Sequence, residues 1–261
     1  MTAIEDAAGV ASRIRPVVQV LGGKFMTSPE LAAVESEVGL PPRSLYVRGR
    51  SAVLGDVPPH VAAELFGIFP HWLFDYVLPP AQEALDAVAA VRAYAESSAR
   101  WSRVNLSAVS EPGRLADLLF RVVDAADASG LALFAGWRRA QRPEGDVERL
   151  GFALMVFREL RGGLHFAALR AVGLSVPEAV VVDPEGGRER LLRTAWPQDA
   201  ADELVASAER KPDLSDRWHR AESLIDDRVG ELLASALTAG EVIELERRLS
   251  TFAQVPAPVR G

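Results

Sequence analysis

The chain contains no cysteine, and its only lysines are Lys24 and Lys211. The absence of cysteine excludes disulfides, thiolate nucleophiles, iron–sulfur clusters and cysteine-ligated zinc. The histidines are dispersed, and none has a second histidine or a carboxylate at metal-ligand spacing; they are His60, His71, His165 and His219. We therefore expect no metal and no other cofactor.

Nucleotide-binding loops are missing as well. Gly22-Gly23-Lys24 lacks the earlier glycine and the following serine or threonine of a Walker A loop. No GxGxxG follows a strand pattern, and no GxSxG motif is present. Nucleotide chemistry therefore has little support.

Long apolar runs are also lacking. The longest are too short to cross a bilayer and are interrupted by charge. Glu5 and Asp6 lie near the N-terminus, where a signal peptide would need a basic region followed by an apolar run. The net charge of −7 argues against nonspecific binding to nucleic acid or to an anionic membrane. We expect a soluble cytoplasmic protein with no membrane partner.

What the chain does have is 261 residues, 49% of them hydrophobic, which is enough for a sizeable core. Helix starts recur: Ser28-Pro29-Glu30 is one, and Thr2 with Glu5 and Thr238 with Glu241 are capping-box patterns. Pro79-Pro80 predicts the start of a long helix. Residues 177–190 fit either a short helix and a loop or a hairpin, and the run of valines there favours a strand. The fold class is all-α, with at most one small β-hairpin.

Residues 152–174 are the stretch around which the chain is organised. They predict a helix, a break at Gly162-Gly163 and a second helix, with charges close to the break: Arg158, Glu159, Arg161 and His165. Charges crowded among apolar residues are costly to bury unless they are paired or used. One interpretation is an anion pocket in which His165 moves a proton. The other is an internal salt-bridge network that ties helices together.

Two further groups bear on a site. Arg50 could point into the same pocket, or could satisfy the last carbonyls of a short helix. The aromatic run 66–76 includes Phe69, Trp72 and His71, which could wall a cavity for a flat apolar ligand. Such a run is also typical of plain core, with His71 bonded to a backbone carbonyl.

Three segments, 50–55, 58–73 and 157–174, resemble a family of bacterial helix-turn-helix proteins. The matching residues are Arg50, Gly55, Arg158, Glu159, Arg161, Gly162 and His165, whereas Leu160 and Gly163 depart from the family pattern. The resemblance implies a multi-helix bundle with winged-helix-like units, similar to MarR-type regulators. We accordingly divide the chain into an N-terminal helical region (1–145), a central helix pair with a degenerate winged-helix-like region (146–253) and a flexible tail (254–261), forming one compact unit.

The segments that would read DNA in such a protein are acidic. A recognition helix needs Arg, Lys, Asn or Gln to reach phosphates and base edges. Residues 197–209 contain no Arg or Lys and have acidic side chains at Asp199, Asp202, Glu203 and Glu209. The sequence therefore predicts that DNA is not a partner.

The favoured hypothesis is a small-molecule-binding protein. Its ligand would be apolar or aromatic, with an anionic or carbonyl group, and the protein could be a cofactor-free enzyme for cyclisation, isomerisation or elimination. His165 would shuttle the proton and Glu159 would orient it, while Arg50, Arg158 and Arg161 hold the negative charge and Phe69, Trp72 and His71 contact the ligand. Two alternatives stay open: a ligand-responsive MarR-like regulator, dimeric through its terminal helices, and a scaffold protein with no pocket.

Overall fold

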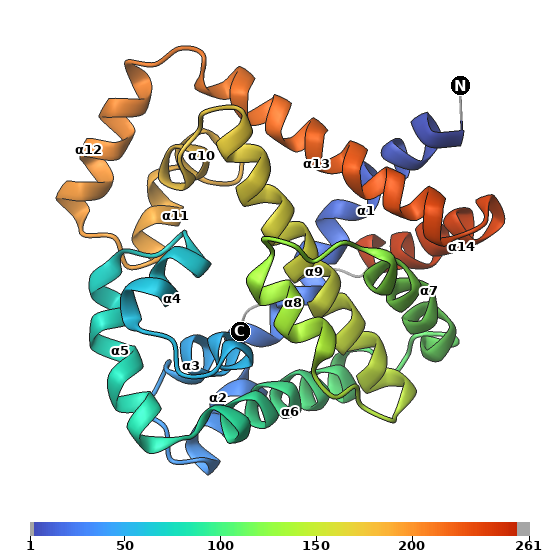
Figure 1. Ribbon diagram of the computed structural model, residues 1–261, viewed down its shortest axis with the longest axis horizontal. Coiled ribbons are helices and arrows are strands. Elements are labelled where there is room, and N and C mark those ends of the chain that lie inside the picture. Colours follow the sequence, from blue (N-terminus) through green and yellow to red (C-terminus); the bar gives the residue numbers. More distant parts are fainter. Residues whose placement is uncertain (1–2, 255–261) are drawn as a thin grey trace.

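The computed structural model describes residues 3–254, and these residues form an all-α fold without a strand, as predicted (Figure 1). The helices are α1 (Ala3–Gly23), α2 (Pro29–Glu37), α3 (Leu45–Ser51), α4 (Pro59–Phe66), α5 (His71–Ala84), α6 (Ala87–Asn105), α7 (Pro112–Ala125), α8 (Ala132–Arg139), α9 (Asp146–Ala171), α10 (Val176–Val182), α11 (Gly187–Arg193), α12 (Gln198–Glu209), α13 (Leu214–Ala236) and α14 (Ala239–Ser250). Short 3-10 segments cover Lys24–Thr27, Ala52–Leu54 and Thr251–Gln254.

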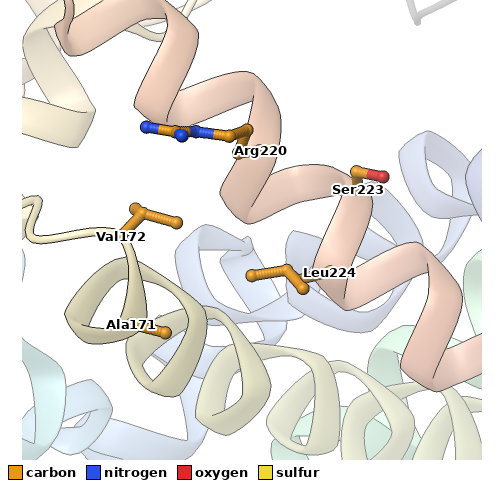
Figure 2. A pocket seen from close by; sticks show the side chains of 5 residues that line it. All are labelled: Ala171, Val172, Arg220, Ser223 and Leu224. Carbon is orange, nitrogen blue, oxygen red and sulfur yellow. The ribbon is translucent and has the colours of Figure 1, made fainter.

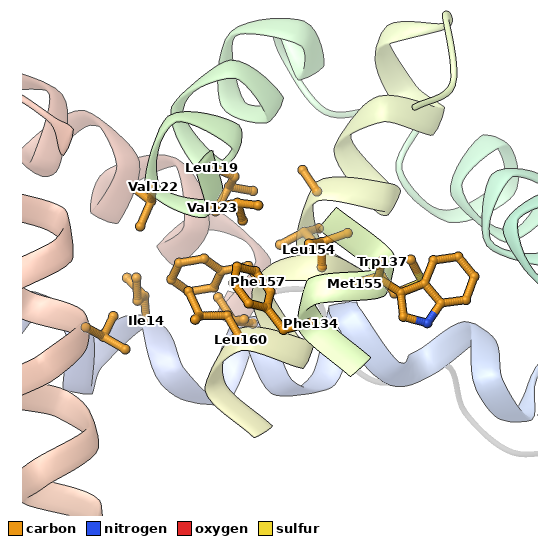
Figure 3. Close-up of a cluster of buried hydrophobic side chains, with 14 of the residues drawn as sticks. Ile14, Leu119, Val122, Val123, Phe134, Trp137, Leu154, Met155, Phe157 and Leu160 are labelled. Atoms are coloured by element: carbon orange, nitrogen blue, oxygen red, sulfur yellow. The ribbon is translucent and has the colours of Figure 1, made fainter. Parts of the chain in front are cut away.

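Helix α9 is the centre of the core, because α1, α6, α7, α8 and α13 all pack against it. Every residue from Leu150 to Phe157 is buried, as expected of a helix that is apolar all round. Figure 3 shows Leu154, Phe157 and Leu160 of α9 between apolar side chains of α7 and α8, with Ile14 of α1 close by.

The predicted break at Gly162-Gly163 is wrong, because α9 continues through both glycines to Ala171. Two glycines in a helix interior cost about 1 kcal/mol each relative to alanine. The flanking turns bury Phe157, Leu160 and Leu169, and burial contributes about 1.5–3 kcal/mol for each such side chain. Packing on both sides thus outweighs the local preference for a turn.

Residues 177–190 contain most of the helix α10, a short loop at 183–186 and the start of the helix α11, so the hairpin interpretation is wrong. Ser175 and Glu178 form a capping box at the start of α10, in which the Glu178 carboxylate accepts from the Ser175 backbone N–H at 3.0 Å. No strand in residues 3–254 is present to pair with the valines of α10. With its cap satisfied and no partner strand, this segment adopts the helix despite its β-branched residues.

Pro79-Pro80 does not start the long helix; both prolines lie inside α5. The long helix is α6, and Asp86 caps it by accepting from the Ala89 N–H at 2.9 Å. The chain turns between the two helices at Leu85, whose carbonyl accepts two hydrogen bonds from the buried Arg48 guanidinium. Arg48 therefore donates to a backbone carbonyl at the end of α5, and not to the last carbonyls of its own helix, α3.

Two other predicted helix caps are present, at Ser28 and at Thr238. Ser28 accepts from the Leu31 N–H at 3.3 Å, and Thr238 with Glu241 forms the predicted capping box. The pattern of Thr2 with Glu5 involves a residue outside those described. Of the predicted flexible tail, residues 255–261 also lie outside them, and Gln254 ends a 3-10 segment.

Helices α10, α11 and α12 pack against one another as a three-helix unit (Figure 1). Its small core contains Val180, Leu191 and Ala201, and Trp196 and Ile68 pack against this cluster. The Trp196 indole N–H donates to the Ile68 carbonyl at 2.9 Å. Ile68 belongs to the turn between α4 and α5, so this contact joins the three-helix unit to a distant part of the chain.

Whether a helix can span a membrane depends on its length and apolar character, and this can be judged for the helices of residues 3–254. No single helix there is long and apolar enough to cross a bilayer. Only α9 and α10 taken together, bent by 97°, satisfy the length and composition test.

Candidate functional site

Arg50 and Glu159 form a buried ion pair. Arg50 Nε and Nη2 each lie 2.8 Å from a Glu159 carboxylate oxygen, and Nη1 lies 3.1 Å from the Tyr46 hydroxyl. Arg158 adds a longer contact of 3.6 Å to the same carboxylate. Burial alone would raise the pKa of Glu159, but the charge and hydrogen bonds of Arg50, together with Arg158, hold it below its ordinary value. Glu159 is therefore a carboxylate that is fully engaged within the protein.

Arg161 and His165 face a second network, between α9, α1 and α13. Arg161 Nη2 lies 3.2 Å from Asp226 Oδ1, and His165 Nδ1 lies 3.3 Å from Glu222 Oε1. Arg15 of α1 contacts both carboxylates, Glu222 at 2.7 Å and Asp226 at 3.3 Å. Burial lowers the pKa of Arg161, against the opposing effect of its acidic neighbours. This network connects three helices.

The continuous helix explains why His165 and Glu159 face different partners. Residues six apart on an α-helix point about 120° away from each other. Glu159 accordingly faces Arg50 of α3, while His165 faces Glu222 of α13. The expected pocket required a bend at Gly162-Gly163, and without it these charges form two separate ion-pair networks.

A cavity of about 320 Å³ lies beside these networks, between the α4–α5 turn, the end of α9 and the three-helix unit. Its lining residues are Ala63, Glu64, Gly67, Phe69, His71, Phe166, Leu169, Arg170, Leu174, Ser175, Val176, Pro177 and Trp196. Phe69 and His71 were expected to contact a ligand and do line the cavity. Trp72 does not line it and is 49% exposed.

The shape of the cavity depends on Gly67. Gly67 caps the C-terminal end of α4 and has a φ of +68°, a backbone conformation that residues with a side chain rarely adopt. A β-carbon added there would lie 2.8 Å from the Phe166 ring, so the ring sits directly against the backbone of the turn. The cavity continues beyond this contact to the indole of Trp196.

Four polar side chains line the cavity: Glu64, His71, Arg170 and Ser175. His71 Nε2 lies 3.2 Å from Glu64 Oε1, and both side chains are largely exposed. Arg170 lies in the last turn of α9, and its one hydrogen bond to the described residues is a long one, 3.3 Å, to the Phe166 carbonyl. No carboxylate of residues 3–254 forms an ion pair with Arg170.

A second hollow, of about 380 Å³, lies between the end of α9 and α13, and Figure 2 shows its lining side chains. These side chains are Ala171, Val172, Arg220, Ser223 and Leu224. Leu224 is 47% exposed, and no aromatic residue faces this hollow. The aromatic cavity offers more varied contacts and is the better candidate for a ligand site.

Sequence reasoning missed Phe166, Arg170 and Trp196 as cavity residues. Arg158, Gly162, Phe166 and Arg170 are spaced by four and so lie along one side of a continuous helix. That spacing would have pointed to Phe166 and Arg170 if the glycines had been interpreted as helix interior. Trp196 reaches the cavity through a long-range contact that has no local sequence signal.

The sequence predicts neither a metal site nor a basic recognition helix, and two features of the described residues bear on this. In the part of the chain that the structure describes, no three His, Asp or Glu residues are grouped so that they could hold a metal ion. The acidic side chains of α12 are exposed; they are Asp199, Asp202, Glu203 and Glu209. One of them, Asp202, forms an ion pair with Arg188 of α11.

The fold is an all-α, multi-helix one, and sequence comparison gives the class of protein. Residues 11–258 match the Helix-turn-helix family, and the chain belongs to that family. No match was found among curated proteins or among solved structures. The similarity to MarR-type regulators stays a prediction.

Proposed function

We propose that this helix-turn-helix family member binds an apolar or aromatic small molecule in the cavity between the α4–α5 turn, α9 and the three-helix unit. The observation that supports this is the lining: aromatic walls from Phe69, Phe166 and Trp196, with a few polar groups. Cavities of a few hundred cubic ångströms with mainly apolar walls are typical ligand sites.

The proposal can be tested with 1-naphthalenemethanol, a neutral flat probe. Titration followed by calorimetry is expected to show saturable binding in the cavity lined by Trp196. Val176→Trp, which adds a bulky side chain to the cavity wall, should weaken binding at least about 10-fold. Val88→Trp is the matched control, because Val88 is 62% exposed on α6, and it should leave binding unchanged. Binding that is absent, or equally strong in Val176→Trp, contradicts the proposal.

Catalysis without a cofactor is an extension of this proposal. The expected roles of His165 and Glu159 stay proposals, but the histidine that lines the cavity is His71, paired with Glu64. In a screen of aromatic ketones and acids, turnover should fall in His71→Ala and persist in His165→Ala. The reverse pattern would favour the His165 assignment.

The second candidate is a ligand-responsive transcriptional regulator, dimeric through its terminal helices. Family membership and the three-helix unit favour it. The exposed carboxylates of α12 oppose it, because a recognition helix contacts anionic phosphates. A mobility shift on the DNA upstream of its gene that weakens steeply with salt would support this function.

A further inference from the structure

We propose that Arg170 is an anion anchor, so that the cavity prefers an aromatic acid over the neutral molecule of the same shape. This inference rests on the proposed function and specifies the chemical class of the ligand. It assigns the role of holding negative charge to Arg170 instead of Arg50, Arg158 and Arg161.

Among these arginines, Arg170 differs from the others in charge compensation. Arg50 and Arg158 contact Glu159, and Arg161 contacts Asp226. These guanidiniums already have carboxylate partners inside the protein, and recruiting Arg50 to a ligand would leave the Glu159 carboxylate buried with its main partner lost. Arg170 has no ion-pair partner among the described residues and lines the cavity.

The position of Arg170 on α9 also suits an anion anchor. Arg170 lies one helical turn beyond Phe166 on α9, so a ring stacked near Phe166 places a short acid substituent near the guanidinium. A guanidinium can bind a carboxylate through two parallel N–H···O bonds, which favours a planar acid group. The Glu64 carboxylate also lines the cavity and pairs with His71. Because this carboxylate would repel an acid group close to it, the acid group of the ligand is expected to lie near Arg170.

The C-terminal end of α9 needs a cation if an anion is to bind close to it. The carbonyl end of α9 carries partial negative charge and would repel an anion. Arg217 of α13 donates to the Gly173 carbonyl just beyond this end, at 3.0 Å. Arg217 is itself paired with Asp213 at 2.6 Å. Arg170, which contacts the Phe166 carbonyl, is therefore the cation at this end that has no carboxylate partner among the described residues.

The test compares 1-naphthoate with 1-naphthalenemethanol on the full chain. The wild type is expected to bind the acid on the order of 5-fold more tightly, a modest factor because Arg170 is exposed and solvent screens the pair. Arg170→Gln should bring the two affinities to parity, while leaving that for the alcohol unchanged. Arg170→Lys should keep part of the preference, because it keeps the charge but loses the planar fork.

Arg139→Gln is the matched control. Arg139 is also an exposed arginine in the last turn of a helix, α8, and it is not part of the cavity wall. This variant should retain the preference for the acid. A preference that is absent in the wild type, or that survives Arg170→Gln, overturns the inference while binding of the alcohol still supports the cavity. Failure of both probes to bind contradicts the proposed function itself.

Discussion

At the scale of single residues, Glu159 near the middle of α9 is neutralised by Arg50 in a buried ion pair. Their side chains are 9% and 2% exposed and are joined by two hydrogen bonds of 2.8 Å. Trp137 also donates to the Arg50 carbonyl at 3.1 Å. A pair buried this deeply is expensive to break, because the remaining charge keeps its desolvation cost.

Glu159→Gln is therefore expected to destabilise the protein by roughly 3–5 kcal/mol, since it leaves Arg50 buried without its counter-ion. Urea denaturation measures this change. Glu96→Gln is the control: Glu96 is 44% exposed and pairs with Arg100, so its loss should cost less than about 1 kcal/mol. The double variant Arg50→Met with Glu159→Leu should recover much of the lost stability. Equal effects of the two glutamine variants would contradict this account.

At the scale of elements, the continuity of α9 can be tested at Gly162. A β-carbon there meets no atom within 4 Å, and the residue has helical backbone. Gly162→Ala should stabilise the protein by up to about 1 kcal/mol through helix propensity alone. A turn at this position would instead make alanine neutral or harmful. Thermal unfolding of the variant distinguishes the two.

At Gly230, where α13 packs against α1, a substitution by alanine is expected to destabilise the protein. A β-carbon at Gly230 would lie 2.6 Å from the Ala8 backbone nitrogen, so the two helices would have to separate. Gly230→Ala should destabilise by about 1–3 kcal/mol, because overpacking exceeds the gain in helix propensity. The comparison with Gly162→Ala in one denaturation series serves as the control. A stabilising Gly230→Ala would show that these helices can move apart at little cost.

Local signals explain which elements could be predicted. Ser28 before Pro29, and Thr238 with Glu241, involve neighbours in sequence, and both caps form as expected. The local preferences of Gly162-Gly163 and of the valines of α10 were overridden, because burial decided the first segment and the second has no partner strand in residues 3–254. The partner of Glu159 lies 109 residues away, and no local pattern identifies such a pair.

At the scale of the whole molecule, carboxylates dominate the dependence of stability on pH. Burial would raise the pKa of Glu178, but Lys211 and Ser175 lower it to about 2. The Thr238 backbone N–H and Arg121 lower that of Glu241 to about 2. Burial would also raise the pKa of Glu222, but the hydrogen bond and charge of His165 outweigh it. Each of these groups binds protons less readily in the folded chain than in the unfolded chain.

The sign of the effect follows from these shifts. A carboxylate with a lowered folded pKa contributes stability above its ordinary value of 4.5, and this contribution is lost as the pH falls toward 2. The urea midpoint should therefore fall steadily between pH 5 and pH 2. Glu241→Gln should lower the midpoint at pH 7 and make the acid-side decline shallower. A midpoint that stays constant down to pH 2 would contradict the ion-pair geometry.

The negative net charge of the whole protein also predicts that it does not bind duplex DNA. With a net charge of −7 and exposed carboxylates on α12, the protein should not shift duplex DNA even at about 50 mM salt. A basic helix-turn-helix protein run in parallel is the positive control. A shift that is lost as salt rises would instead establish the regulator function.

The contact between Gly67 and Phe166 has a consequence for how the hollow could evolve. The Phe166 ring lies so close to Gly67 that a β-carbon there would be 2.8 Å from it. Gly67→Ala would therefore displace the ring. A chain with any other residue at this position would need a different position for the Phe166 ring, and hence a cavity of different shape.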